Sequence, residues 1–120
     1  MWVGEVGPLR AVVWEGDSRS VIRSFPGDVK DRMGDDLFRV QQGKEPLRFR
    51  PMRSVGMGVF ELKDADERGW YRVMYYTQVK GRIYVLHAFE KTTRKTSHRD
   101  LNLARNRLKR VKERLRKGLI

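Results

Sequence analysis

The chain has 120 residues, a length that suits one domain with a single core. It carries 27 lysine and arginine residues against 15 acidic residues, a formal net charge of +12, and it has no cysteine. The missing cysteine excludes a disulfide framework and thiolate chemistry. The two histidines, His87 and His98, lie in unlike settings, so we expect no metal site and no cofactor.

No apolar run approaches the roughly 18 residues of a membrane span. The first ten residues lack the cationic start and apolar stretch of a secretory signal, so we expect no membrane association and a cytoplasmic location.

Most of the positive charge lies in the last quarter of the sequence. Residues 91–120 contain 12 basic and 2 acidic residues, a net charge of +10. A polyanion such as nucleic acid is the first partner to consider, because neutralising phosphates releases counterions. The same field would attract an acidic protein or an anionic membrane surface, so charge alone leaves these alternatives open.

The N-terminal half predicts a strand and a helical hairpin. Residues 1–8 read as a loose end, and residues 9–14 form a valine-rich strand pattern. Asp17 or Ser18 caps a helix, and Pro26 suits the first turn of a second helix that Gly43 ends. The apolar residues recur at helical spacing on one face: Val21, Ile22, Phe25, Val29, Met33, Leu37 and Val40.

The following segment predicts a long loop and then three strands. Residues 44–58 hold two prolines and two glycines, and a loop of that length carrying Arg48, Arg50 and Arg53 is typical of a functional segment. The strands cover residues 59–63, 70–77 and 82–89, joined by an acidic turn at 64–69 and a turn at 78–81. The last strand has Ile83, Val85 and Phe89 on one face and Tyr84, Leu86 and Ala88 on the other, which predicts a central strand covered on both sides.

A basic helix ends the chain. Ser97 and Asp100 form a capping box, and an apolar stripe follows at Leu101, Ala104, Leu108, Val111 and Leu115. The element order predicts an α+β domain with helices on a mostly antiparallel sheet.

Three cations cluster between the last strand and this helix. Lys91, Arg94 and Lys95 could clamp a phosphate and stabilise a pentacovalent phosphorane, or they could be a solvated charge run. Arg72 alternates with Trp70, Met74 and Tyr76 along its strand. It could pair with an acid such as Glu61 on the neighbouring strand, extend along the surface, or point into a cleft.

Other side chains are candidates for proton transfer and for base stacking. His87 could move a proton near neutral pH, although a histidine in an apolar strand is more often a packed, hydrogen-bonded residue. Glu90 is a second candidate base, and a salt bridge to Lys91 or Arg94 is its alternative role. Trp70, Tyr75 and Tyr76 could stack on bases only if they lie on a sheet face that the helices leave open.

Four segments carry a resemblance to a known family: GVFELK (58–63), YRVMYY (71–76), YVLHAFEKTTRKT (84–96) and LARNRL (103–108). Over residues 9–115 the chain resembles the RelE/HigB superfamily of bacterial type II toxins, in particular the phage-derived Gp49-like branch. The resemblance implies a RelE-like single domain covering residues 1–120.

The resemblance also implies an activity: metal-independent endoribonuclease cleavage of mRNA, on the ribosome. It places Arg72 and Arg94 at the scissile phosphate and gives charge stabilisation and proton transfer to Lys91 and Lys95. We assign further RNA contacts to Arg48, Arg53, Arg99 and Arg105.

The partner that the resemblance implies is a cognate helix-turn-helix antitoxin of the HigA/Xre-like kind. Two other classes of function remain open. One is a non-catalytic RNA- or DNA-binding module that uses the basic helix over residues 98–117, and the other is a protein-interaction module whose basic surface an acidic partner covers.

Overall fold

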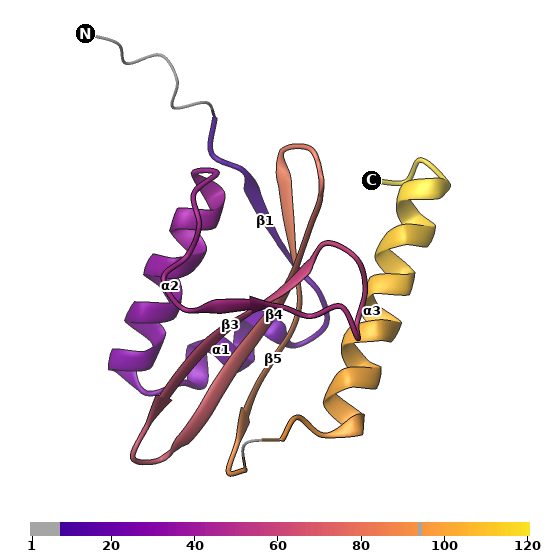
Figure 1. The fold of residues 1–120 in the computed structure, drawn as a ribbon. Helices are drawn as coiled ribbons and strands as arrows, with labels where there is room; N and C mark the ends of the chain where they lie inside the picture. The colour runs from indigo at the N-terminus through magenta and orange to yellow at the C-terminus, as the bar shows by residue number, and fades with distance from the viewer. Residues whose placement is uncertain (1–7, 94) are drawn as a thin grey trace, which may run out of the picture.

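A computed structural model describes residues 8–93 and 95–120. Residues 1–7, predicted as a loose end, and Arg94 lie outside the described residues. The elements in chain order are β1 (Ala11–Trp14), α1 (Ser18–Ser24), α2 (Gly27–Gln41), β2 (Phe49–Pro51), β3 (Val59–Asp66), β4 (Gly69–Val79), β5 (Arg82–Lys91) and α3 (His98–Arg116) (Figure 1).

The five strands form one mixed sheet in the order β1-β5-β4-β3-β2. Strand β1 pairs with β5 in parallel, and the other three pairings are antiparallel. The predicted α+β class with a mostly antiparallel sheet is therefore confirmed. Among the described helices, none is both long and apolar enough to cross a bilayer.

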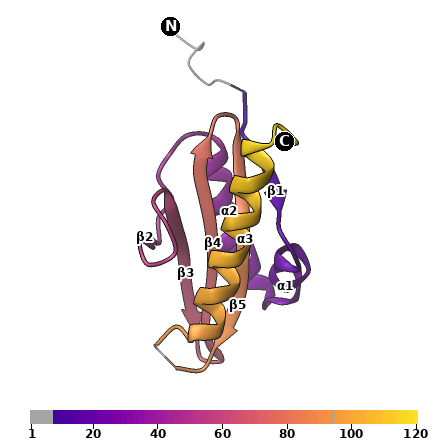
Figure 2. The same ribbon diagram turned by 90° about the vertical axis from the view of Figure 1, so that its right-hand side faces the viewer.

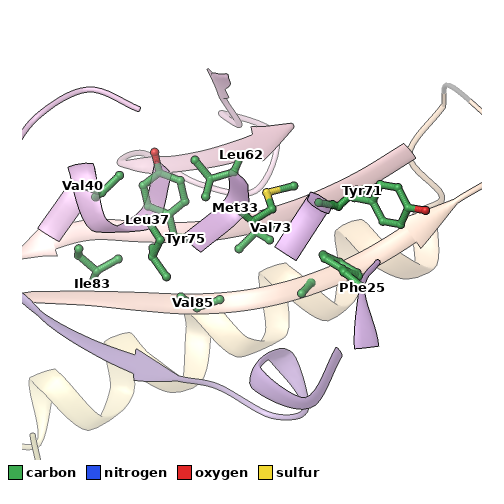
Figure 3. Packing of buried hydrophobic residues seen from close by; sticks show 12 residues of the cluster. Phe25, Met33, Leu37, Val40, Leu62, Tyr71, Val73, Tyr75, Ile83 and Val85 are labelled. Carbon is green, nitrogen blue, oxygen red and sulfur yellow. The ribbon is translucent and has the colours of Figure 1, made fainter. Parts of the chain in front are cut away.

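Helices cover both faces of the sheet. In Figure 2, α3 lies in front of β4 and β5, and α2 lies behind the sheet. The α2 side holds one apolar cluster, in which Met33 and Leu37 face Leu62 and Val73 (Figure 3). The sequence pattern of this helix is confirmed, since Val29, Met33, Leu37 and Val40 are all buried.

Helix α3 covers the opposite face with the predicted stripe. Ala104, Leu108 and Val111 are buried in a second cluster that also contains Met74, Tyr76, Tyr84 and Leu86. The predicted cap is present: the Ser97 hydroxyl accepts a hydrogen bond from the Asp100 backbone N–H at 3.1 Å and donates one to the Asp100 carboxylate at 2.6 Å. Strand β5 is thus covered on both faces, as predicted.

A β-bulge changes which residues of β5 face each helix layer. Met74 pairs with His87 and Tyr75 pairs with Val85, so Leu86 is an extra residue on β5. Leu86 and the next residue, His87, therefore both face α3, and the alternation reverses after them. Ala88 joins the α2-side cluster and Phe89 the α3-side cluster, opposite to the predicted assignment of these two residues.

Two other predicted boundaries are wrong. The predicted loop at 44–58 contains the edge strand β2, whose three residues pair with β3 and include Pro51. Such a short, proline-bearing edge strand has no alternation long enough to identify from sequence. The predicted turn at 64–69 contains the end of β3, because Asp64, Ala65 and Asp66 continue the ladder with β4.

The α3 stripe makes a testable contribution to stability. Leu108 is 4% exposed and Leu119 is 68% exposed. We expect Leu108→Ala to reduce the free energy of unfolding by about 2–5 kcal/mol, because it leaves a cavity in the core. The matched control, Leu119→Ala, should change it by less than about 0.5 kcal/mol. Urea denaturation followed by circular dichroism measures both, and equal effects would contradict the packing of α3 described above.

Candidate functional site

An open groove of about 750 Å³ lies over β2, β3 and the start of β4. Four of its lining residues are cations and one is an acid, so the groove favours an anion. The lining residues are Leu47, Arg48, Phe49, Arg50, Lys63, Asp64, Ala65, Trp70 and Arg72.

Beneath the groove, one buried carboxylate holds two of these arginines. Glu61 is 0% exposed, and its Oε1 lies 2.9 Å from Nε of Arg50 and 3.5 Å from Nε of Arg72. The strand register explains the cluster, because Arg50 lies directly opposite Glu61 and Arg72 lies one diagonal step away, opposite Lys63. Of the alternatives that the sequence leaves open for Arg72, the pairing with Glu61 is present.

Arg72 lines the groove as well as pairing with Glu61. Its Nη1 donates hydrogen bonds to the backbone oxygens of Asp64 (3.1 Å) and Tyr71 (2.9 Å), which fix the orientation of the guanidinium. Its Nη2 forms no hydrogen bond with any described residue. Burial lowers the pKa of Arg72, but an arginine remains charged at neutral pH. A fixed cation with an open Nη2 is thus available to a ligand in the groove.

Lys91 ends β5, in the strand register opposite Trp70. Its Nζ donates a hydrogen bond to Oγ1 of Thr96 at 3.0 Å. Burial, and then the positive charge of Arg72, lower the pKa of Lys91 below its usual range, and Glu61 only partly opposes this. The ammonium group therefore gives up a proton more readily than a solvent-exposed lysine does.

A second groove, of about 380 Å³, shares one lining residue with the first. Arg50 lines both grooves, and Lys95 and Thr96 line the second beside Ser54 and Leu101. Of the predicted cluster of Lys91, Arg94 and Lys95, only Lys95 lines a groove; Lys91 reaches the second groove through its hydrogen bond to Thr96, and Arg94 lies outside the described residues. Sequence reasoning named Arg50 only as a loop residue, because β2 was not predicted.

The four candidate RNA-contact arginines occupy different settings. Arg48 lines the larger groove and forms an ion pair with Asp36 of α2 at 3.4 Å. Arg105 donates from Nε to the Ser54 backbone oxygen at 2.8 Å and lines a separate hollow along α3. Arg53 and Arg99 are exposed and are not among the residues that line either groove.

His87 is a packed, hydrogen-bonded residue. Its Nε2 lies 2.8 Å from the Asp100 carboxylate and its Nδ1 lies 3.2 Å from Nη1 of Arg107, while its ring stacks on Phe89. An arginine only donates and a carboxylate only accepts, so the ring is neutral with its proton on Nε2. Burial, the main cause, lowers the pKa of His87. Both ring nitrogens are thus engaged away from the groove.

Glu90 and the three aromatic residues considered for base stacking lie on different faces of the sheet. Glu90 is exposed and pairs with Tyr71, whose side chain belongs to the α2-side cluster, so Glu90 points away from Arg72 and Lys91. Tyr75 and Tyr76 are buried in the two cores, at 2% and 7% exposure. Trp70 alone of the three lines the groove.

Among the described residues, no group of three or more histidine, cysteine, aspartate or glutamate side chains is placed to hold a metal ion. The chemical groups that converge on the grooves are guanidinium and ammonium ions, with Glu61 beneath them. Such an arrangement is suited to bind a phosphate and to stabilise negative charge that develops on it.

Residues 20–109 match the protein family described as "Phage derived protein Gp49-like (DUF891)". The chain belongs to this family. The Gp49-like family is a phage-derived family of RelE/HigB-type toxins, as the sequence resemblance predicted. No curated protein matches the chain. Arg50, Glu61, Arg72, Lys91 and Thr96 all lie within the matched residues, so the site described above is part of the Gp49-like domain.

The setting of His87 predicts a pH dependence of stability. Its pKa in the folded state lies below the ordinary value of 6.5, so the unfolded chain binds more protons as the pH falls through this range. The stability that the neutral ring contributes is therefore present above about pH 6.5 and is lost below it. We expect the parent protein to lose more stability than His87→Gln between about pH 7.5 and pH 5.5.

Urea denaturation at both pH values provides the measurement. The control is His98→Gln, which replaces an exposed histidine and should keep the pH dependence of the parent. An identical pH dependence in the parent and in His87→Gln would contradict a neutral, buried His87.

Proposed function

We propose that this Gp49-like protein is an endoribonuclease that cleaves mRNA without a metal ion and so inhibits translation and arrests growth. The observation that carries the proposal is a fixed arginine, Arg72, in a cation-lined groove, together with Lys91, whose pKa burial and the charge of Arg72 lower and whose Nζ bonds Thr96 of the second groove. Membership of a toxin family supports the same conclusion.

RNA carries its own nucleophile, which suits a site of this composition. The ribose 2′-oxygen attacks the adjacent phosphorus, and the bond from phosphorus to the 5′-oxygen breaks. The products are a 2′,3′-cyclic phosphate and a 5′-hydroxyl, with one proton leaving the 2′-hydroxyl and one reaching the 5′-oxygen. The protein has only to orient the phosphate, stabilise its charge and move these protons.

We assign the scissile phosphate to Arg72, because its Nη1 is engaged by two backbone oxygens and its Nη2 remains able to donate to a phosphate oxygen. Lys91 suits the proton transfer to the leaving oxygen, because its lowered pKa makes it a stronger acid than an ordinary lysine. Lys95 and Arg94 add charge stabilisation from the loop that follows. Arg50, shared by the two grooves, and Arg53 suit the neighbouring phosphates.

Trp70 gives the groove a wall on which a base can stack. A single-stranded segment fits this arrangement better than a duplex does, because only unpaired bases present a free face to an aromatic ring. This favours mRNA, presented as a single strand on the ribosome in the cytoplasm, as the substrate.

A toxin family implies an antitoxin partner. We propose a helix-turn-helix protein of the HigA/Xre-like kind with an acidic contact surface, because the net charge of +10 over residues 91–120 steers acidic partners toward this chain. Any repression of the operon would come from the DNA-binding motif of that partner.

The first test is the loss of Lys91. We expect Lys91→Ala to reduce the cleavage rate by about two to three orders of magnitude, the usual effect of losing one aligned charge in a catalytic site. Lys80→Ala, in the exposed turn after β4, is the matched control and should cleave at the parent rate. Growth after induced expression and mapping of mRNA 5′ ends give the readouts.

Arg72 needs a different variant, because its removal would leave Glu61 buried with one partner fewer. Arg72→Lys keeps the charge and loses the planar guanidinium, so it should fold and still cleave far more slowly. If folded Lys91→Ala cleaves like the parent, the assigned role is wrong. If the parent binds RNA but no new 5′ ends appear, the protein is a non-catalytic RNA-binding module.

The second test concerns metal ions. We expect cleavage to persist in EDTA and the products to end in a 2′,3′-cyclic phosphate, because the 2′-oxygen is the nucleophile. Mass spectrometry of the cleaved oligonucleotide identifies the terminus. Loss of activity with the chelator, restored by a divalent ion, would contradict the proposed mechanism.

A further inference from the structure

A small apolar hollow lies between the helical layer and the sheet, on the face opposite the grooves. Its volume is about 230 Å³. Its walls and floor come from β1, α1, α2, β3 and β4, and the apolar lining residues are Trp14, Ile22, Met33, Leu37, Leu62 and Val73. Figure 3 shows four of these, Met33, Leu37, Leu62 and Val73, close together on this side of the sheet.

Three cations surround the hollow: Arg19 and Arg23 of α1 and Lys30 of α2. All three are exposed, and none forms a side-chain hydrogen bond or ion pair with a described residue. The contrast with Arg32 of the same helix layer is informative, because Arg32 lies 2.7 Å from Asp64 and 3.8 Å from Asp28. The hollow is therefore an apolar site whose edge has positive charge available to a partner.

A glycine borders the hollow. Gly34 lines it from the middle of α2, and a Cβ atom built there would meet no atom within 4 Å. Packing therefore does not require glycine at this position, although glycine is the least favourable residue after proline inside a helix. One turn later on the same helix face, Phe38 is 47% exposed and extends the apolar surface beside the hollow.

We propose that this hollow is the docking site for the antitoxin, through an acidic segment that inserts an apolar side chain. An apolar anchor in a pocket with charged neighbours at its edge is the usual arrangement of an interface hot spot. The aliphatic floor offers no partner for a phosphate, so the hollow fits a peptide and not RNA. The inference rests on the proposed function, because it takes the protein to be a toxin that a partner silences.

The hollow and the groove lie on opposite faces of the same two strands. Leu62 and Val73 line the hollow, whereas their chain neighbours Glu61 and Arg72 form the ion pair beneath the groove. Variants in the hollow can therefore change partner binding without changing a residue that contacts RNA.

The experiment fills the hollow. The probe is the proposed antitoxin, the purified helix-turn-helix protein encoded by a gene adjacent to that of this chain. It is titrated by calorimetry into this chain carrying Lys91→Ala, because that variant can be produced without arresting the host. We expect Gly34→Trp to weaken binding at least about 30-fold, because it blocks the anchor. Gly34→Ala, which adds one methyl group, is the matched control and should bind like the parent.

A second variant does not depend on filling the hollow. Reversing Arg19 and Arg23 to glutamate should weaken binding by about tenfold or more, whereas reversing Lys109 and Lys112 on α3 should have a smaller effect that disappears with added salt. Circular dichroism, and RNA cleavage by the same variants with Lys91 intact, verify that each is folded.

The outcomes are distinct. Parent-like binding by a folded Gly34→Trp variant, or loss of binding only on reversal of the α3 lysines, would overturn the inference. Failure of the parent to bind the probe would exclude the antitoxin as the occupant. Binding that depends on Gly34 in a protein that cleaves no RNA would uphold the docking site and refute the ribonuclease.

Discussion

The buried carboxylate of Glu61 is the constraint on which the groove depends. Moving a charge out of water costs several kcal/mol unless it is paired, and Glu61 is paired with Arg50 on one neighbouring strand and with Arg72 on the other. The constraint is reciprocal. Arg50 and Arg72, which line the larger groove, would repel each other if no anion lay beneath them. Only Oε1 of Glu61 contacts the arginines, and its buried Oε2 has no hydrogen-bond partner among the described residues.

The β-bulge at Leu86 helps to fix the position of α3 beside the end of β5. It turns Leu86 and His87 toward α3, where Nη1 of Arg107 contacts the Leu86 carbonyl and the His87 ring. Nη2 of Arg107 also bonds Asp17, and Arg114 bonds Glu15, so the β1–α1 connection holds the same helix. Asp100 caps α3 and binds His87, which fixes the start of the helix relative to β5. The short connection with Lys95 and Thr96 is thereby held beside Lys91.

The sequence predicts the elements in which apolar residues repeat regularly over many positions. The stripe of α3, the apolar face of α2 and the two-sided burial of β5 follow from helical spacing and from a continuous apolar run. The pairing of Arg72 with Glu61 was among the alternatives that the sequence left open, because both residues stand in adjacent predicted strands. These features depend on residues near in sequence or on neighbouring strands.

What escaped prediction depends on contacts that leave no local pattern. Strand β2 has only three residues, and one of them is a proline, so it was not predicted. Arg50 could therefore not be assigned to the site, although Arg48 and Arg53 nearby were predicted to contact RNA. The bulge is one extra residue that only the pairing with β4 reveals, and it exchanged the faces of Ala88 and Phe89. The hollow beside Gly34 requires residues from five elements to meet, and a helical glycine read from sequence suggests only a weak point in the helix.

The alternation of β3 and β4 separates two kinds of surface on one thin molecule. Along these strands, each residue that points to the grooves is followed by one that points to the α2 layer, so Glu61, Lys63 and Arg72 lie on one side and Leu62 and Val73 on the other. The strands between are close-packed on both faces, and such packing resists small displacements. An acidic segment seated in the hollow would therefore leave the Glu61–Arg72 pair in place. A partner bound on that face would then inhibit the proposed ribonuclease by its size alone. Such steric exclusion would block a large substrate, such as mRNA on a ribosome, much more than a short free oligonucleotide.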